Sequence, residues 1–136
     1  MYKSIVYLVV SLILVSCTSH MPSYEPFIDI PDAAAELQAL YIGRGQGKVF
    51  YLKFELASDS LANLVIETCG SELIQRDNPF LSTMTDPNWL PEWWDAGQYD
   101  EMLVQSCINN GAGIDIGAVD TESNDRFLVY IEIAIL

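Results

Sequence analysis

The stretch of this chain whose residue types could do the most chemistry is an aromatic cluster interleaved with carboxylates. Its aromatic members are Trp89, Trp93, Trp94 and Tyr99. The acidic residues among and beside them are Asp86, Glu92, Asp95, Asp100 and Glu101. Exposed tryptophans next to carboxylates can stack on sugar rings or anchor a basic protein partner, because each Trp offers a large apolar surface with one polar N–H. These four aromatic residues are the candidate binding residues.

The alternative is that the same aromatic side chains fold inward and cover a sheet. Trp93 and Trp94 are adjacent, and adjacent side chains in irregular backbone tend to point in opposite directions. We therefore expect at least one of the two to be buried, which leaves the other as the candidate contact residue.

Catalytic chemistry is restricted by the histidine content. The only histidine is His20, near the amino terminus. A Ser-His-Asp or Cys-His nucleophilic site, an HExxH metal motif and a histidine-bearing zinc site are therefore excluded from the rest of the chain. Pairs of carboxylates do catalyse glycoside hydrolysis, but no two of the 19 acidic residues form a recognisable pair. We expect a binding protein with no cofactor and no metal, and a carboxylate-based enzyme is the least favoured alternative.

The segment GRGQGK, at 43–48, invites comparison with a phosphate-binding loop. The residues that flank it are not the glycine and the Ser or Thr that this motif needs. We interpret the segment as a connection between a helix and a strand. Three basic residues in or just after the segment could still contact a lipid phosphate or an acidic partner. They are Arg44, Lys48 and Lys53.

The segment DTESND has the spacing of a calcium loop at Asp120, Glu122 and Asn124. Asp125 stands in place of the required glycine, and Ile131 stands in place of the final glutamate. We therefore expect a solvated hairpin tip at this point of the chain.

The amino-terminal segment MYKSIVYLVVSLILVSC has the organisation of a secretory signal. Lys3 forms a short positive region, and an apolar run extends from Ile5 to Val15. A spanning helix needs about 20 apolar residues, so this run is too short to anchor the chain as a helix.

Leu14, Val15, Ser16 and Cys17 resemble the lipobox of bacterial lipoproteins at every position. The resemblance implies cleavage before Cys17, a diacylglycerol on its sulfur and acylation of the new amino terminus. Several acyl chains anchor a protein stably where one chain is marginal. Thr18 stands where inner-membrane lipoproteins carry Asp, which implies the periplasmic side of the outer membrane, with inner-membrane retention and surface exposure as alternatives. The alternative to the lipobox itself is a secretory signal with an incidental cysteine.

The expected organisation is a signal at residues 1–16, a lipidated cysteine and tether at 17–30, and a single globular domain at 31–136. The signal removes Lys3, so the mature chain keeps five of the six basic residues against 19 acidic ones, a formal charge of −14 in place of −13. This charge disfavours nucleic acid and favours a basic protein as partner. We predict a protein-binding or envelope-assembly accessory role, with peptidoglycan or glycan binding as the alternative.

Cys69 and Cys107 remain as an even pair once Cys17 is lipidated, and no CxxC spacing suggests redox or metal chemistry. We predict a disulfide between them, which would contribute about 4 kcal/mol to stability in the chain-entropy model. The alternative is two buried free thiols.

The fold prediction is an α+β domain with a mostly antiparallel sheet of about five strands and two helices. Hydrophobic periodicity places the helices at 31–42 and 96–108, with a long aromatic loop at 76–95. The strands are expected at 48–56, 63–69, 72–75, 113–119 and 126–136, with a tight hairpin at Gly70 and Ser71. A small β-sandwich, in which the second helix is another strand, is the alternative.

Overall fold

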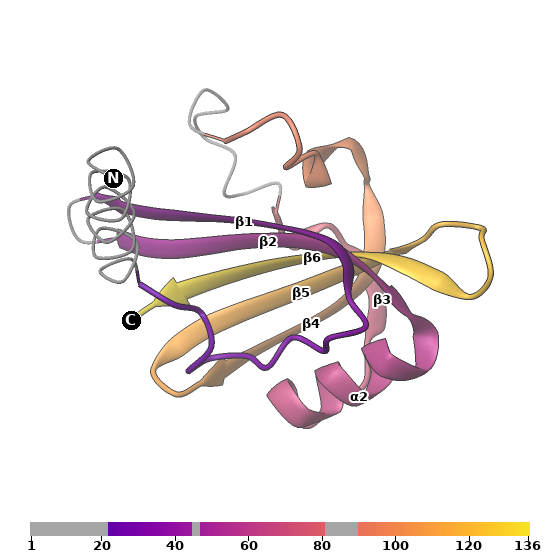
Figure 1. The fold of residues 1–136 in the computed structure, drawn as a ribbon, viewed down its shortest axis with the longest axis horizontal. Coiled ribbons are helices and arrows are strands. Elements are labelled where there is room, and N and C mark those ends of the chain that lie inside the picture. Colours follow the sequence, from indigo (N-terminus) through magenta and orange to yellow (C-terminus); the bar gives the residue numbers. More distant parts are fainter. Residues whose placement is uncertain (1–21, 45–46, 81–89) are drawn as a thin grey trace, which may run out of the picture.

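The computed structural model of the chain describes residues 22–44, 47–80 and 90–136. In these residues the chain forms a six-stranded sheet and one α-helix (Figure 1). The elements are β1 (Ala35–Arg44), β2 (Gly47–Ala57), α2 (Ser58–Cys69), β3 (Ile74–Asp77), β4 (Glu101–Asn109), β5 (Ala112–Asp120) and β6 (Arg126–Ile135), with a 3₁₀ turn at Ala96–Gln98. No helix in the described ranges is long and apolar enough to cross a membrane.

The strands lie in the order β1-β2-β6-β5-β4-β3, and every neighbouring pair is antiparallel. β1 and β3 are therefore the edges, and β6 is an inner strand between β2 and β5. The prediction of a mostly antiparallel, β-rich α+β domain is confirmed. The predicted counts of five strands and two helices are wrong, and a β-sandwich does not form because all described strands belong to one sheet.

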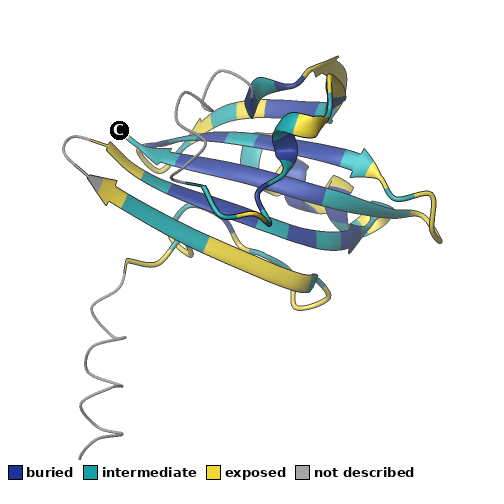
Figure 2. Cartoon of the chain, turned by 90° about the horizontal axis from the view of Figure 1, so that it is seen from above, coloured by how far each residue is buried: buried dark blue, intermediate teal, exposed yellow. Residues whose placement is uncertain are grey.

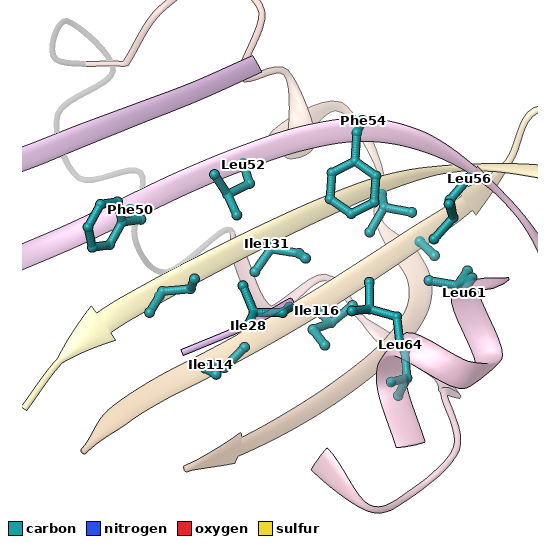
Figure 3. Close-up of a cluster of buried hydrophobic side chains, with 14 of the residues drawn as sticks. Ile28, Phe50, Leu52, Phe54, Leu56, Leu61, Leu64, Ile114, Ile116 and Ile131 are labelled. Atoms are coloured by element: carbon teal, nitrogen blue, oxygen red, sulfur yellow. The ribbon is translucent and has the colours of Figure 1, made fainter. Parts of the chain in front are cut away.

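One face of the sheet, which we call the helix face, is covered by α2 and by the segment that precedes β1. Alternate residues of each strand point toward it, as the pleat of a strand requires. Figure 3 shows the core that results. Its buried residues include Phe50, Leu52, Phe54, Leu56, Ile114, Ile116, Ile131 and Ile133 from the strands, and Ile28, Leu61 and Leu64 from the cover.

The opposite face, the loop face, is covered by part of the long connection between β3 and β4. Its buried residues are Tyr51, Phe80, Trp94, Ala96, Met102, Val104 and Tyr130. Both faces of the sheet thus carry buried apolar side chains, and Figure 2 shows the buried residues, in dark blue, concentrated on its inner strands. The loop predicted at 76–95 does pack through aromatic residues where it is described.

The helix predicted at 31–42 is wrong, because this segment forms the edge strand β1 from Ala35 onward. Leu40 packs on the loop face, whereas Tyr41 packs against Phe50 on the helix face, so the side chains alternate with period two. The short connection to β2 lets the two segments pair as a hairpin. That pairing outweighs the helix propensity of the alanine-rich start, because intrinsic propensity is a small energy compared with tertiary contacts.

The strand predicted at 63–69 is also wrong, because these residues are the second half of α2. Leu61, Leu64 and Val65 are the buried residues of the helix, and their spacing is that of one helical face. Gly70 has a φ of 72° and ends the helix in the left-handed conformation, so it is a helix cap and not a hairpin turn. The predicted strand at 72–75 is shifted to β3.

The helix predicted at 96–108 is wrong as well, because this segment is mainly β4. Met102 and Val104 lie on the loop face while Leu103 lies on the helix face, which is again period two. Asn110 and Gly111 follow with φ values of 55° and 81°, the left-handed pair that a two-residue hairpin favours. The Asn-Gly turn therefore joins β4 to β5, where the prediction had it ending a helix.

The packed structure begins earlier in the chain than the boundary predicted at residue 31. Residues 24–30, which we call the docked segment, lie on the helix face. Ile28 is buried there, and the rings of Tyr24 and Phe27 lie 6.3 and 6.4 Å from the ring of Phe50. Much of the predicted tether is therefore part of the folded domain.

The hairpin between β4 and β5 holds the docked segment in place. The side-chain amide of Asn109 donates to the carbonyl of Phe27 at 2.9 Å, and that of Asn110 donates to the carbonyl of Pro26 at 2.8 Å. In Figure 1 the indigo segment starts near the C label and runs along the α2 side of the sheet.

Cys69 and Cys107 form a disulfide, in agreement with the pairing predicted from the sequence. Their Cα atoms are 5.4 Å apart, within the usual range for such a bond. The bridge joins the last residue of α2 to β4, so the helix is fixed covalently on the face that it covers.

Gly117, on β5, is a position where the loop face leaves no room for a side chain. A Cβ there would collide with Sδ of Met102 and lie 2.7 Å from Cε2 of Phe80. We expect Gly117→Ala to lower the free energy of unfolding by about 1–3 kcal/mol, the usual cost of overpacking a core. Gly113→Ala, on the same strand, is the control because its Cβ would meet only the carbonyl oxygen of Ala134, at 3.9 Å. Urea unfolding compares the two variants, and equal stabilities would contradict this packing.

Candidate functional site

Trp94 is a core residue of the loop face. It is 3% exposed, and its ring contacts those of Tyr51, Phe80 and Tyr130 edge-on at centroid distances of 5.0, 5.3 and 5.4 Å. Its indole N–H has no hydrogen-bond partner in the part of the chain that the structure describes, so ring packing holds it. The inward alternative is therefore correct for Trp94, whose ring is covered.

Trp93 is the member of the adjacent pair that keeps exposed surface. It is half-buried, and its ring lies 6.3 Å from that of Trp94 at an interplanar angle of 80°. Tyr99 is also half-buried, with its ring 6.1 Å from that of Tyr130. Trp89 lies outside the described residues. The structure thus brings Trp93, Trp94 and Tyr99 into one cluster, in which Trp93 is the candidate contact residue.

A lysine, an aspartate and a tyrosine meet directly beside this aromatic cluster. Nζ of Lys53 donates to Oδ1 of Asp95 at 2.8 Å, and the hydroxyl of Tyr130 donates to the same oxygen at 2.5 Å. Nζ of Lys53 also donates to the backbone carbonyl of Trp93 at 3.0 Å and lies 5.4 Å from the centroid of the Tyr130 ring. Sequence reasoning missed this site, because its members are far apart in the chain.

The contacts of these residues set their charge states. Desolvation acts to raise the pKa of Asp95, but the hydrogen bonds from Lys53 and Tyr130 and the positive charge of Lys53 outweigh it, so the pKa lies below its ordinary value. Burial, followed by the hydrogen bond to Asp95, raises the pKa of Tyr130 far above its ordinary value. At neutral pH the site therefore holds the carboxylate of Asp95 and the protonated phenol of Tyr130.

These groups are arranged to hold backbone in place. Nζ of Lys53 donates one hydrogen bond to the carbonyl of Trp93 and another to the carboxylate of Asp95, two residues further along. These two bonds hold the loop on both sides of Trp94. The local signal for this role is a lysine between two apolar residues, Leu52 and Phe54, in the middle of a strand. The result is that Trp93 is presented on rigid backbone.

Asn78 forms a second set of hydrogen bonds that holds the same loop on its other side. Its buried side-chain amide donates to the carbonyls of Ala96 and Tyr99 at 2.6 and 2.8 Å, and its Oδ1 accepts from the backbone N–H of Phe80 at 2.8 Å. Together with Lys53, it fixes the described part of the loop to the sheet.

Charged residues are unevenly distributed between the two ends of the strands. One end, which we call the acidic end, holds the last residues of β2, β3 and β5 and the first residues of β1, β4 and β6. Its carboxylates are Glu36, Glu55, Asp59, Asp77, Asp100, Glu101, Asp120, Glu122 and Asp125. Its basic residues are Arg76 and Arg126, and Arg126 lies 3.9 Å from Glu55.

The other end, which we call the hairpin end, holds the turns between β1 and β2 and between β4 and β5, together with the last residues of β6. Its strand residues, at 41–44, 47–50, 107–114 and 133–136, include Arg44 and Lys48 and contain no Asp or Glu. The domain is therefore electrically polarised along its strands.

The predicted hairpin tip at Asp120 to Asp125 does connect two strands, β5 and β6. The carboxylate of Asp120 accepts from the backbone N–H of Glu122 at 2.8 Å, as in a turn. In the described ranges no three His, Cys, Asp or Glu side chains come close enough together to hold a metal ion.

A shallow apolar hollow of about 190 Å³ lies beside α2. Its walls are mainly Leu61, Val65, Ile66, Leu73 and Phe127. Ligand pockets usually measure about 300–1,000 Å³, so this hollow is smaller than a site for a cofactor-sized molecule.

Comparison of the chain with protein-family models, with curated proteins and with solved structures finds no match. The function has to be inferred from the residues of the chain and their geometry. Two surfaces support such an inference, namely the acidic end and the half-exposed Trp93 with Tyr99.

The lysine–aspartate contact generates a pH-dependent prediction. Because the folded pKa of Asp95 is lowered, its contribution to stability is present above the unfolded pKa, about 3.9, and is lost as the pH falls through the folded value. Asp95→Asn should lower the free energy of unfolding at pH 7 by about 1 kcal/mol, a small value because the Asp95 side chain is 42% exposed and solvent screens the pair.

The control is Glu92→Gln, an exposed acid in the same loop, which should leave stability nearly unchanged. Urea unfolding from pH 7 to pH 3 measures both variants. The loss of unfolding free energy caused by Asp95→Asn should shrink toward zero below about pH 4. A loss that stays constant with pH would contradict the assigned charge state of Asp95.

Proposed function

We propose that this protein is a bacterial lipoprotein, anchored through Cys17 on the periplasmic side of the outer membrane, whose domain binds a basic protein partner as an envelope-assembly accessory module. The observation that supports this best is the position of the charges relative to the docked segment. That segment enters the domain at the hairpin end, where Asn110 holds Pro26. A lipid on Cys17 would therefore leave the acidic end facing away from the membrane.

The anchor itself is proposed from the sequence, since Cys17 lies outside the described residues. Its support is the full lipobox match from Leu14 to Cys17, and the outer-membrane address is proposed from Thr18. Residues 18–21 alone separate Cys17 from Pro22, the first described residue. The domain would thus be held close to the bilayer.

The acidic end supplies a reason for binding a basic partner. Carboxylates gathered at one end of a domain create a negative potential that steers basic proteins and raises their rate of association. Asp120, Glu122 and Asp125 are exposed in the turn between β5 and β6, so they can meet a partner directly. The same charge repels nucleic acid.

Glycan binding is the second candidate, and Trp93 favours it. This residue is half-exposed on fastened backbone and lies next to the exposed carboxylate of Glu92, a combination that suits stacking against a sugar ring with a hydrogen bond at its edge. The two candidates use different surfaces, so a probe placed on each surface separates them.

Anchoring is tested by Cys17→Ser, which removes the only acceptor for the lipid. The variant should move from the membrane fraction to the soluble periplasmic fraction, because no acyl chain then holds it. Ser16→Ala is the matched control, since a small residue keeps the lipobox pattern and the protein should stay with the membrane. Membrane association of Cys17→Ser equal to that of the control would refute the anchor.

Partner binding is tested by photo-crosslinking in intact cells from a photoreactive residue at position 123, in the turn of the acidic end. A discrete protein adduct of basic composition, identified by mass spectrometry, is the expected result. Replacing Asp120, Glu122 and Asp125 by their amides should lower the yield about tenfold, because three exposed charges contribute about 0.5 kcal/mol each.

The control for charge replaces Glu67, Glu72 and Glu92 by Gln, which changes the net charge equally but leaves the acidic end intact. Its adduct yield should stay near that of the unmodified protein. A glycan adduct from a probe at position 93, with no protein adduct from position 123, would favour the second candidate, and no adduct from either position would contradict both.

A further inference from the structure

The hairpin end exposes two large apolar side chains and also holds Lys48. Ile108 is 74% exposed and Leu136 is 79% exposed. The backbone N–H of Leu136 donates to the carbonyl of Gly111, so these residues lie together at the turn between β4 and β5. Lys48 pairs with Ile135 in the ladder, which places a basic residue in the same end.

The charge of this end differs from that of the rest of the protein. Its strand residues contain no Asp or Glu, although the chain has 19. Carboxylates border it. Asp115 and Glu132 pair on β5 and β6 directly inside this end, and Glu25 and Asp29 of the docked segment line a hollow with Glu67 and Asn109. Exposed apolar side chains at an end that also holds Lys48 are a composition that suits an anionic phospholipid surface.

The segment between the proposed anchor, Cys17, and the docked segment is short enough to keep this end near the bilayer. Five residue steps separate Pro22 from Cys17, and at a maximum of about 3.6 Å per residue they span about 18 Å. The docked segment cannot lengthen this span without breaking the hydrogen bonds from Asn109 and Asn110 and exposing Ile28. A lipid on Cys17 would therefore keep the hairpin end beside the headgroups.

We propose that the hairpin end docks on the phospholipid surface of the membrane that holds the anchor. Ile108 and Leu136 then enter the boundary between headgroups and acyl chains, and Lys48 lies beside anionic phosphates. The strands stand away from the bilayer, and the acidic end faces outward. This docking rests on the lipid anchor proposed above, and it adds a second membrane contact that fixes the orientation of the domain.

The test uses the full-length, lipidated protein in vesicles of phosphatidylethanolamine and phosphatidylglycerol. A photoreactive residue replaces Ile108, Leu136 or, at the acidic end, Ser123. Lipid adducts from positions 108 and 136 should exceed those from position 123 at least tenfold by mass spectrometry, because an apolar probe at the boundary meets lipid continuously.

Sedimentation with the vesicles measures the anchor independently of docking. Equal or absent lipid adducts at positions 108, 136 and 123, in protein that does sediment, would overturn the docking and leave the anchor intact. Failure to sediment would overturn both. A protein adduct from position 108 in cells, in place of a lipid adduct, would also overturn the docking.

The contribution of Lys48 is measured by Lys48→Gln in the same vesicles. Loss of one basic residue at an anionic surface should lower the lipid adduct from position 108 by up to about fivefold. Arg76→Gln, which removes the same charge from the acidic end, is the control and should leave the yield unchanged. Equal effects of the two substitutions would show that net charge, and not docking through this end, governs the yield.

Discussion

Both faces of the inner strands carry buried apolar side chains, and the rest of the structure depends on covering each of them. On β6, Val129, Ile131 and Ile133 are buried on the helix face, and Tyr130 is buried on the loop face. A sheet buried on one side only could leave the other to water, but this one cannot. α2 covers part of the helix face, and the docked segment, with Ile28, covers the remainder.

The two covers have different consequences for function. Because the cover of the helix face begins a few residues after Cys17, the proposed membrane anchor and the folding core would be parts of one short piece of chain. The described part of the loop-face cover has one 3₁₀ turn, at Ala96–Gln98, and polar side chains of the sheet hold it in place. Lys53 does so by binding Asp95 and the carbonyl of Trp93. Antiparallel order places the turn between β4 and β5 and the turn between β5 and β6 at opposite ends of the sheet, and the second of these turns carries the exposed carboxylates Asp120, Glu122 and Asp125.

The strands at 48–56, 113–119 and 126–136 could be predicted from the sequence, because each is rich in β-branched and aromatic residues and is bounded by turn residues. The errors at 31–42, 63–69 and 96–108 share one cause, which is that a short apolar segment fits both a helical face and a strand. At 96–108 the Asn-Gly turn that follows was the local evidence for a hairpin.

The candidate site was predicted in part. Because Trp93 and Trp94 are adjacent, the sequence indicates that one of them points inward. It does not indicate which one, because the choice depends on ring partners that only the fold brings together, namely Tyr51, Phe80 and Tyr130. The disulfide was predicted by setting Cys17 aside as the lipidated residue, which left Cys69 and Cys107 as a pair. The contact of Lys53 with Asp95 joins residues 42 positions apart, and no local pattern encodes it.

The most direct measurement of the central claim, that a short anchor holds the hairpin end on the membrane, is neutron reflectometry of the full-length lipidated protein on a supported bilayer. We expect protein density that adjoins the headgroups, with any hydrated gap narrower than the roughly 18 Å that the chain between Cys17 and Pro22 can span. A diffuse layer separated from the bilayer by up to about 45 Å, the extended span of a free tether over residues 17–30, would contradict it.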